Sequence, residues 1–383
     1  GVRSSPAGQT LRAFAERHGI PVTETQAGKS SLPGDHPLNV GAIGVTGSPA
    51  ANALAREADV VLAVGTRLQD FTTGSHSLLA QAQIVGLNVN PMDAYKWQSK
   101  PLVADAQVGL MQLSAALGDW AADANWTARA KDLASQWDAR VTALTLGQPT
   151  GELPYDAEVM GAVRDSLNDA GGDSGKHDVV VCAAGTLPAE LHKLWRASAP
   201  GNYHVEYGYS CMGYEIAGAL GVKMARPTQE VIVMVGDGSY LMMNSEIATS
   251  VMLGHKLIIV VLDNRGFGCI QRLQAATGNA SFNNLLDDCV PEGGQPPAID
   301  FALHAKSLGA HGVHVANVAE LKAAMVQART ARTTQVIVIN TTHRRTTPDG
   351  GCWWEVAIPE VSQRVEVQTA NAQYLQAKQQ QRL

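Results

Sequence analysis

The sequence predicts an α/β fold made of two doubly wound parallel sheets, each in its own domain. Runs that are apolar at every position, such as residues 231–235 and 257–262, are typical of parallel strands buried on both faces. Segments with helical character alternate with these runs, which is the pattern of sheets covered by helices on both sides. The 383 residues are enough for two domains of ordinary size, each with its own core.

The first domain is expected to span residues 1–118. Its expected elements are a helix at 11–18, a strand at 19–25, a helix at 50–58, strands at 60–65 and at 84–90 (ended by Pro91), and a helix at 108–117. The glycine-rich stretch 41–47 follows no clear strand and lacks the spacing of a dinucleotide-binding loop, so we interpret it as an ordinary loop. An alanine-rich segment over 119–150 then predicts a helical connector.

The second domain is expected over residues 151–345, and residues 346–383 form a tail. Its expected elements are helices at 157–168, 215–220, 240–253, 301–308 and 319–329, and strands at 178–182, 231–235, 257–262, 312–315 and 335–340. Residues 271–300, rich in Gly, Asn, Asp and Pro, predict a loop over the mouth of the active site. Trp353 and Trp354 are expected to anchor the tail, which ends in a polar helix over 361–383.

A crossover in the second domain supplies the candidate site. The strands at 231–235 and 257–262 flank a helical segment, and a right-handed strand–helix–strand unit opens both post-strand loops at the same edge of the sheet. Asp237 and Asn264 follow those strands, so we expect them to lie side by side. A carboxylate, an amide oxygen and a backbone carbonyl are ligands that suit Mg²⁺.

The residues around Asp237 also have the features of a phosphate site. Gly236 and Gly238 let the backbone approach phosphate oxygens closely, and a helix starting near Ser239 directs its free N–H groups to the same place. The alternative interpretation is an ordinary tight turn, with Asn264 as a helix cap. That interpretation suits the tripeptide alone, whereas the spacing of the whole unit favours a diphosphate held through a metal.

The tripeptide at 236–238 followed by the Asp-Asn pair at 263–264 resembles the signature of thiamine-diphosphate-dependent enzymes. The resemblance covers nearly the whole chain and implies that Mg²⁺ and thiamine diphosphate bind here. It implies that Asp237, Asn264 and the carbonyl of Gly266 hold the metal. The pair begins with aspartate where family members usually have a first asparagine, and the implied ligand is the second residue.

The resemblance implies further cofactor contacts. Gly185 and Thr186, at the corner after the strand at 178–182, would reach the diphosphate. Backbone groups of Ser210 and Met212 would bond the pyrimidine edge, and the Met212 side chain would hold the two rings in a bent shape. The alternative for Met212 is ordinary core packing at a helix start.

Four stretches, at residues 23–29, 64–75, 203–215 and 263–270, resemble one branch of the family in particular. That branch opens a polyhydroxylated cyclic 1,2-diketone, trihydroxycyclohexane-1,2-dione, to 5-deoxyglucuronate in inositol catabolism. The opening is a hydrolytic cleavage of a carbon–carbon bond. We expect Glu206, Tyr207 and Gln271 to lie near the substrate, with Glu206 and Gln271 as candidate catalytic residues; a structural ion pair is the alternative for Glu206.

Two other functions stay open. An acetolactate-synthase-like carboligase shares the fold and the cofactor but joins two keto acids. A non-catalytic cofactor-binding fragment is the other, because the family's pyrimidine-activating glutamate belongs to a domain that precedes the central one. We expect no such domain before residue 1, so we assign that role to no residue and expect the chain alone to be incomplete.

The composition indicates which partners to expect. A net charge of −6 gives no attraction to nucleic acid, and no apolar run or signal-peptide pattern predicts contact with a membrane. Five scattered cysteines without paired spacing indicate reduced thiols in the cytoplasm. The resemblance implies a homodimer or homotetramer with its active site between subunits.

Overall fold

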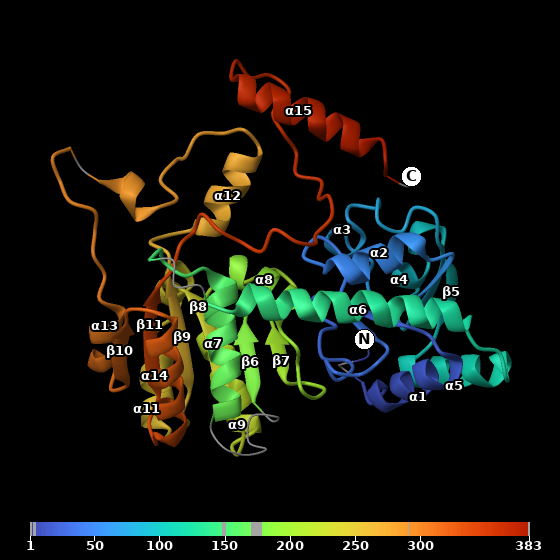
Figure 1. The fold of residues 1–383 in the computed structure, drawn as a ribbon, viewed down its shortest axis with the longest axis horizontal. Coiled ribbons are helices and arrows are strands. Elements are labelled where there is room, and N and C mark those ends of the chain that lie inside the picture. The colour runs from blue at the N-terminus through green and yellow to red at the C-terminus, as the bar shows by residue number, and fades with distance from the viewer. Residues whose placement is uncertain (1, 3–4, 148–150, 170–177, 291, 382–383) are drawn as a thin grey trace.

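The computed structural model describes residues 2, 5–147, 151–169, 178–290 and 292–381. Its larger sheet has six strands, all parallel, in the order β10-β11-β9-β8-β6-β7 (Figure 1). The strands are β6 (Val179–Cys182), β7 (Tyr203–Val205), β8 (Val231–Gly236), β9 (Ile258–Asp263), β10 (His311–Val315) and β11 (Gln335–Asn340). The predicted parallel α/β architecture is confirmed.

Helices cover both faces of this sheet because alternate strand residues point to opposite sides. Ile258 and Val260 of β9 belong to the core that includes α7 (Asp156–Asp169), α8 (Thr186–Leu194) and α14 (Val318–Thr330). Ile259 and Val261 belong to a second core. The helices of that core are α9 (Tyr214–Ala225), α10 (Asp237–Met242), α11 (Glu246–Met252) and α13 (Phe301–Ser307).

The first half of the chain contains two smaller parallel sheets. Their strands are β1 (Val22–Glu24) beside β2 (Asn39–Ala42), and β3 (Val60–Val64), β4 (Gln83–Asn88) and β5 (Lys100–Val103) in that order. The helices around them are α1 (Gly8–His18), α2 (Pro49–Glu57), α3 (Asp70–Thr73), α4 (Pro91–Ala94), the 3-10 turn η2 (Lys96–Gln98) and α5 (Ala106–Leu117). Phe14 of α1 and Leu110 of α5 share a core with Leu87 of β4.

The expected connector is the long helix α6 (Ala124–Thr145), which runs across both halves (Figure 1); residues 148–150 of that prediction lie outside the described residues. Its buried Trp137 and Val141 belong to the same core as Leu54 of α2 and Met160 of α7. The two halves therefore share one continuous apolar core.

Polar contacts also cross this junction, where the segment after β1 packs on α8. The Lys29 ammonium donates to the His192 carbonyl at 2.9 Å, and Gln26 donates to the Pro188 carbonyl at 2.7 Å. His192 Nε2 in turn lies 3.0 Å from the carbonyl oxygen of Glu24. The first half thus contacts the helix that begins at the carboxyl edge of β6.

Two expectations for the second half are wrong. The helix expected at 240–253 is two helices, α10 and α11, because Met243 leaves helical geometry (φ −151°, ψ 67°) before an Asn-Ser pair that favours helix ends. The stretch 271–300 is not all loop. It begins inside α12 (Gly268–Ala276), whose Gln, Arg, Leu and Ala residues are good helix formers, and contains the 3-10 turn η4 (Leu286–Cys289).

Three strands were not predicted, because each is short and lacks a continuous apolar run. They are β2, whose last two residues overlap the stretch interpreted as a loop, β5, which contains a proline, and the three-residue β7. The strand expected to be ended by Pro91 stops earlier, at Asn88, and Pro91 instead opens α4, where a proline at the first turn loses no helical hydrogen bond.

The tail returns to the first half of the chain, as Figure 1 shows, and ends in α15 (Val365–Lys378). Trp354 meets the ring of Phe71 edge-on with centroids 5.5 Å apart, and Trp353 lies 6.3 Å from the ring of Tyr374. The expected anchoring is confirmed for Trp354, whereas the ring of Trp353 contacts a residue of the tail itself. No helix within the described residues has both the length and the apolar character needed to cross a bilayer.

Candidate functional site

The carboxyl edge of the large sheet brings Asp237 and Asn264 together. Strands β8 and β9 are neighbours, and Gly236 pairs with Leu262 in their register. Asp237 follows β8 as the first residue of α10, and Asn264 follows β9 directly. The two side chains therefore start from adjacent strand ends, as the crossover predicts.

Asp237 is buried, with 3% of its surface exposed. Its Oδ2 accepts the backbone N–H of Gly266 at 2.7 Å, whereas its Oδ1 is buried without a hydrogen-bond partner among the described residues. Burial, followed by the nearby carboxylate of Asp263, raises the pKa of Asp237 to about 7, although the Gly266 N–H acts in the opposite direction. The site thus holds a carboxylate that burial penalises and that a cation would stabilise.

Asn264 contributes a second uncompensated oxygen, since its Oδ1 is also buried without a partner in the described part of the chain. Buried oxygens that lack partners cost free energy unless a bound group satisfies them. A small cation that prefers oxygen ligands, such as Mg²⁺, would satisfy both oxygens, so the residues present fit that ion. Within the same described residues, no group of three or more His, Cys, Asp and Glu side chains offers a different metal site.

The loop after Asn264 has a fixed shape. Asp263 Oδ1 accepts the N–H of Arg265 at 2.9 Å, which supports the positive φ of 62° at Arg265. Gly266 has a φ of 139°, and a Cβ there would lie 2.5 Å from the carbonyl oxygen of Asn284. The backbone conformation at position 266 therefore requires glycine, and Asp263 stabilises the turn by accepting the N–H of Arg265.

The glycines that flank Asp237 differ in their surroundings. A Cβ on Gly238 would lie 2.6 Å from the ring of Phe267, whereas a Cβ on Gly236 would meet nothing within 4 Å. Gly238 thus permits close packing, and Gly236 borders open space. Ser239 is expected to bind the cofactor, and its hydroxyl donates to the buried carboxylate of Glu215, with both oxygens at 2.8 Å.

The predicted diphosphate corner lies after β6. Gly185 precedes α8 with a φ of 83°, and Thr186 is the first residue of that helix. The guanidinium of Arg272, on α12, donates to the Thr186 hydroxyl and to the carbonyl of His343. A helix N-terminus and a fixed cation therefore meet at this corner, which is suited to an anion.

The predicted pyrimidine-edge segment is a tight loop organised by Glu206. The Glu206 carboxylate accepts the N–H groups of Gly208 (2.7 Å), Tyr209 (3.1 Å) and Cys211 (2.7 Å). Although burial alone would raise the pKa of Glu206, these donors lower it. Ser210 has a φ of 55° and donates its hydroxyl to the carbonyl of Ala183 at 3.3 Å.

These contacts give Glu206 a loop-shaping role, in place of the structural ion pair considered as its alternative; its catalytic role stays a prediction. Met212 ends this loop, half-buried, two residues before α9 begins. Gln271 lies on α12, where its side-chain carbonyl accepts from Ser281 at 2.9 Å and from Asn284 at 3.2 Å. Gln271 therefore links α12 to the segment that follows it.

The sequence reasoning missed three residues near this edge, namely Glu215, Arg272 and Asp156. Glu215 is 1% exposed, and a glutamate in the first turn of an apolar, Ala/Gly-rich helix is a signal that could have identified it. The contacts of Arg272 depend on α12, which was not predicted. Asp156 begins α7, and burial, followed by the carboxylate of Glu190, raises its pKa to about 7.

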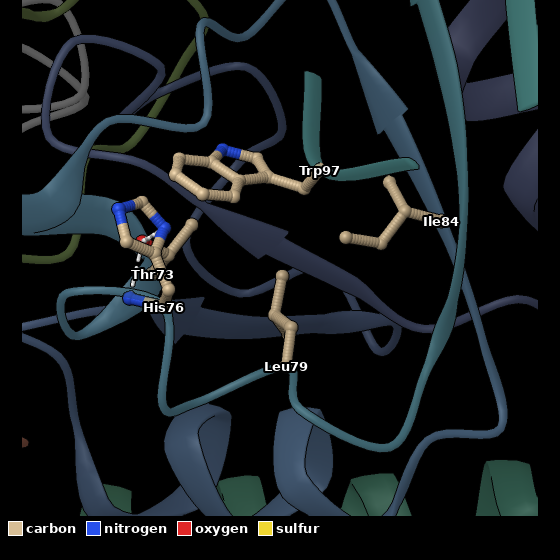
Figure 2. A pocket seen from close by; sticks show the side chains of 5 residues that line it. All are labelled: Thr73, His76, Leu79, Ile84 and Trp97. Carbon is tan, nitrogen blue, oxygen red and sulfur yellow. Dashed lines mark hydrogen bonds between the residues drawn. The ribbon is translucent and has the colours of Figure 1, made fainter. Parts of the chain in front are cut away.

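A separate small hollow lies in the first half of the chain, as Figure 2 shows. Its lining residues are Thr73, His76, Leu79, Ile84 and Trp97. The rings of His76 and Trp97 are tilted by 32° with centroids 3.3 Å apart, and His76 Nε2 lies 3.0 Å from Asp70 Oδ1. Burial lowers the pKa of His76 despite this carboxylate, so the hollow offers a neutral ring.

Two family models match the sequence. Residues 183–340 match the C-terminal TPP-binding domain of thiamine pyrophosphate enzymes, and residues 1–113 match the central domain of the same enzymes. Together the two matches cover well over half of the chain and include the site from the corner after β6 to the end of β11.

Curated proteins named 3D-(3,5/4)-trihydroxycyclohexane-1,2-dione hydrolase are also similar. The protein of Geobacillus thermodenitrificans (strain NG80-2) is 40% identical over 390 aligned positions. Those of Bacillus anthracis and Bacillus thuringiensis (strain Al Hakam) are each 38% identical over 393 positions. Each alignment covers 97% of this chain and 61% of the relative, so the chain spans about three fifths of the relatives' length.

Proposed function

We propose, from the premise that this chain belongs to the thiamine pyrophosphate enzyme family, that it takes part in the hydrolytic opening of a cyclic 1,2-diketone. The substrate class comes from the names of the relatives, whose length the chain covers in part. The reaction adds water across a carbon–carbon bond: the hydroxyl goes to the carbonyl carbon that becomes a carboxylate, and a proton goes to the other carbon. The trihydroxycyclohexanedione named for the relatives is the proposed substrate, and 5-deoxyglucuronate is the proposed product, which places the reaction in inositol catabolism.

The single observation that supports this proposal most is the pair of unpartnered buried oxygens, Asp237 Oδ1 and Asn264 Oδ1. We assign to them, with the carbonyl of Gly266, the binding of Mg²⁺ and through it the diphosphate of the cofactor. The N–H that Gly266 donates to Asp237 Oδ2 keeps the second carboxylate oxygen occupied, so the first is left for the cation. A divalent ion would also offset the burial and the nearby Asp263 carboxylate, which together raise the pKa of Asp237.

The cofactor, when bound, supplies an electron sink for the breaking of a carbon–carbon bond next to a carbonyl. The residues of this chain bind and orient. Gly185 and Thr186 present the N-terminus of α8 to phosphate oxygens, and Arg272 holds Thr186 in place. Ser210 and Met212 end a loop whose shape Glu206 fixes, so that backbone groups there can contact a ring edge.

Three aromatic residues from separate segments support a substrate surface beside that loop. The ring of Phe71 lies 5.4 Å from that of Tyr207 and 5.5 Å from that of Trp354. Aromatic faces pack against the C–H groups of a ring, while hydroxyls of the substrate need polar partners. Burial raises the pKa of Tyr207, so its hydroxyl stays protonated and can donate a hydrogen bond.

Calorimetric titration of thiamine diphosphate with Mg²⁺ into the chain and into its Asp237→Ala variant tests cofactor binding. Only the unmodified chain is expected to bind, and equal affinity would overturn the metal assignment. Product analysis follows, with the cyclic diketone or pyruvate as substrate and with the remaining part of a relative supplied. Ring-opened acid supports the proposal, a joined keto acid indicates a carboligase, and binding without turnover of either indicates a non-catalytic fragment.

We also propose a cytoplasmic homodimer or homotetramer with the active site between subunits. All five cysteines have free thiols, which supports a reducing compartment. Met242 and Met243, beside the proposed metal loop, are 53% and 45% exposed, which supports an additional covering surface at the site. Light scattering of the purified chain tests the proposed assembly, and a monomer would contradict it.

A further inference from the structure

We propose that Glu215 is a positioning residue that sets the spacing of three cofactor-facing loops. The inference rests on the proposed function and adds a residue to which the sequence analysis gives no role. Glu215 is the second residue of α9, and its side chain is directed into the protein rather than to solvent, with 1% of its surface exposed. A buried carboxylate needs several donors to offset the loss of hydration.

The donors come from three different segments. The Ser239 hydroxyl lies 2.8 Å from each carboxylate oxygen, and the N–H of Gly213 lies 2.9 Å from Oε2. The N–H of Ala184 completes the set with a longer contact of 3.4 Å to Oε1. The Gly213 N–H also lies 2.8 Å from Ser239 Oγ, so the donors are joined to one another as well.

Each donor stands next to a residue predicted to contact the cofactor. Ala184 directly precedes Gly185 at the diphosphate corner, and Gly213 directly follows Met212 at the pyrimidine edge. Ser239 lies two residues after Asp237, in the first turn of α10 beside the proposed metal site. A single carboxylate therefore ties together the three segments that would hold the two ends of thiamine diphosphate.

A carboxylate suits this position because it only accepts, and all of its partners are donors. An amide would place an N–H₂ group against at least one of these N–H or O–H donors. Burial raises the pKa of Glu215, while Ser239 and the backbone N–H groups of Ala184 and Gly213 oppose that rise. A change to glutamine is therefore expected to alter the spacing of the loops more than the volume of the side chain.

Glu24 provides a matched control. It is 5% exposed, and its Oε1 accepts the N–H groups of Ser31 (2.8 Å) and Leu32 (3.2 Å) in the first half of the chain. Both glutamates are thus buried carboxylates that bind backbone N–H groups. Only Glu215 contacts the cofactor-facing loops, so a general effect of losing a buried charge would appear equally in both variants.

The test measures the affinity of the whole chain for thiamine diphosphate with saturating Mg²⁺ by calorimetry. Glu215→Gln is expected to raise the Kd at least tenfold, about 1.4 kcal/mol, and to weaken the circular-dichroism signal of the bound cofactor at saturation. Glu24→Gln is expected to lower thermal stability but leave both readouts unchanged. The double variant with Ser239→Ala is expected to bind no more than about twofold worse than Glu215→Gln alone, because the two residues act as one unit.

Equal Kd values and equal dichroism for the Glu215 and Glu24 variants would overturn the inference. If Glu215→Gln does not fold, Glu215→Asp keeps the charge but shortens its reach, and a severalfold rise in Kd is expected. If the unmodified chain binds no cofactor, the proposed function fails first. Amide hydrogen exchange at Ala184 and Gly213 then decides the role of Glu215, since unchanged protection in Glu215→Gln would refute it.

Discussion

Replacing Asp237 with asparagine is expected to stabilise the metal-free chain while abolishing its affinity for the cofactor. Asparagine has nearly the same shape, and its side-chain carbonyl can still accept the N–H of Gly266. Oδ1 of Asp237 has no partner that the change could remove. What disappears is a buried negative charge close to the carboxylate of Asp263, which is costly when no cation is bound.

The pKa of Asp237 gives the size of the effect. It rises from an ordinary 3.8 to about 7 on folding, so the folded chain binds this proton more tightly than the unfolded chain does. The free energy of unfolding is therefore not reduced by Asp237 at low pH, and it falls as the pH rises from about 4 through 7. At 1.36 kcal/mol per pKa unit, the raised pKa of Asp237 costs about 1.5 kcal/mol at about pH 5, where the folded chain keeps it protonated, and about 4 kcal/mol at about pH 8, where it is mostly ionised.

Urea unfolding of the metal-free protein at the two pH values is the assay. The gain in unfolding free energy of Asp237→Asn over the unmodified chain should grow by about 2.5 kcal/mol between the lower and the higher pH. Asp156→Asn is the control. The pKa of Asp156 is also about 7 and the residue is 5% exposed, but it begins α7 and does not follow β8 or β9. It should show a similar gain and keep its Mg²⁺-dependent binding. A loss of stability in Asp237→Asn at the higher pH would refute the reasoning.

Three further changes have definite expected outcomes. Gly266→Ala forces a Cβ to within 2.5 Å of the Asn284 carbonyl oxygen at a φ of 139°. Thermal unfolding should show that the free energy of unfolding falls by about 1–3 kcal/mol, and calorimetry should show weaker cofactor binding. Unchanged affinity would argue against metal binding by Gly266 and its neighbours. Arg272→Gln removes the guanidinium that holds Thr186 and should raise the cofactor Kd severalfold, whereas an unchanged Kd would show that α12 does not order the diphosphate corner. Lys29→Met should raise the unfolding free energy at neutral pH by about 1–2 kcal/mol, because burial lowers the pKa of Lys29 from 10.5 to about 8 and penalises its charged form. That gain should fade as the pH rises from 8 through 10.5, where the unfolded chain also loses the proton, and urea unfolding across this range is the check.

The placement of Asp237 beside Asn264 could be predicted because its causes are local. Two fully apolar runs define adjacent strands, and the handedness of the crossover opens both following loops at one edge. The same reasoning overestimated the helix at 240–253. Helical propensity is a weak guide at a polar break such as Asn244, where side chains compete for backbone hydrogen bonds.

Contacts between distant loops were beyond the reach of sequence patterns. The residue types around Glu206 do not indicate that the backbone N–H groups of Gly208, Tyr209 and Cys211 would surround its carboxylate. The pairing of Glu215 with Ser239 arises only once the loop before α9 and the loop after β8 are brought together. The contact of Arg272 with Thr186 likewise needs α12 to cross the end of the sheet.

The helix α6 has a consequence for dissecting this protein. Because Trp137 and Val141 are buried together with side chains from both ends of the chain, a cut near the connector would strip each piece of part of its interior. Trimming the protein to its second half would therefore expose apolar surface that the first half now covers. The fragment is expected to aggregate, so its behaviour would not represent that of the second half in the whole chain.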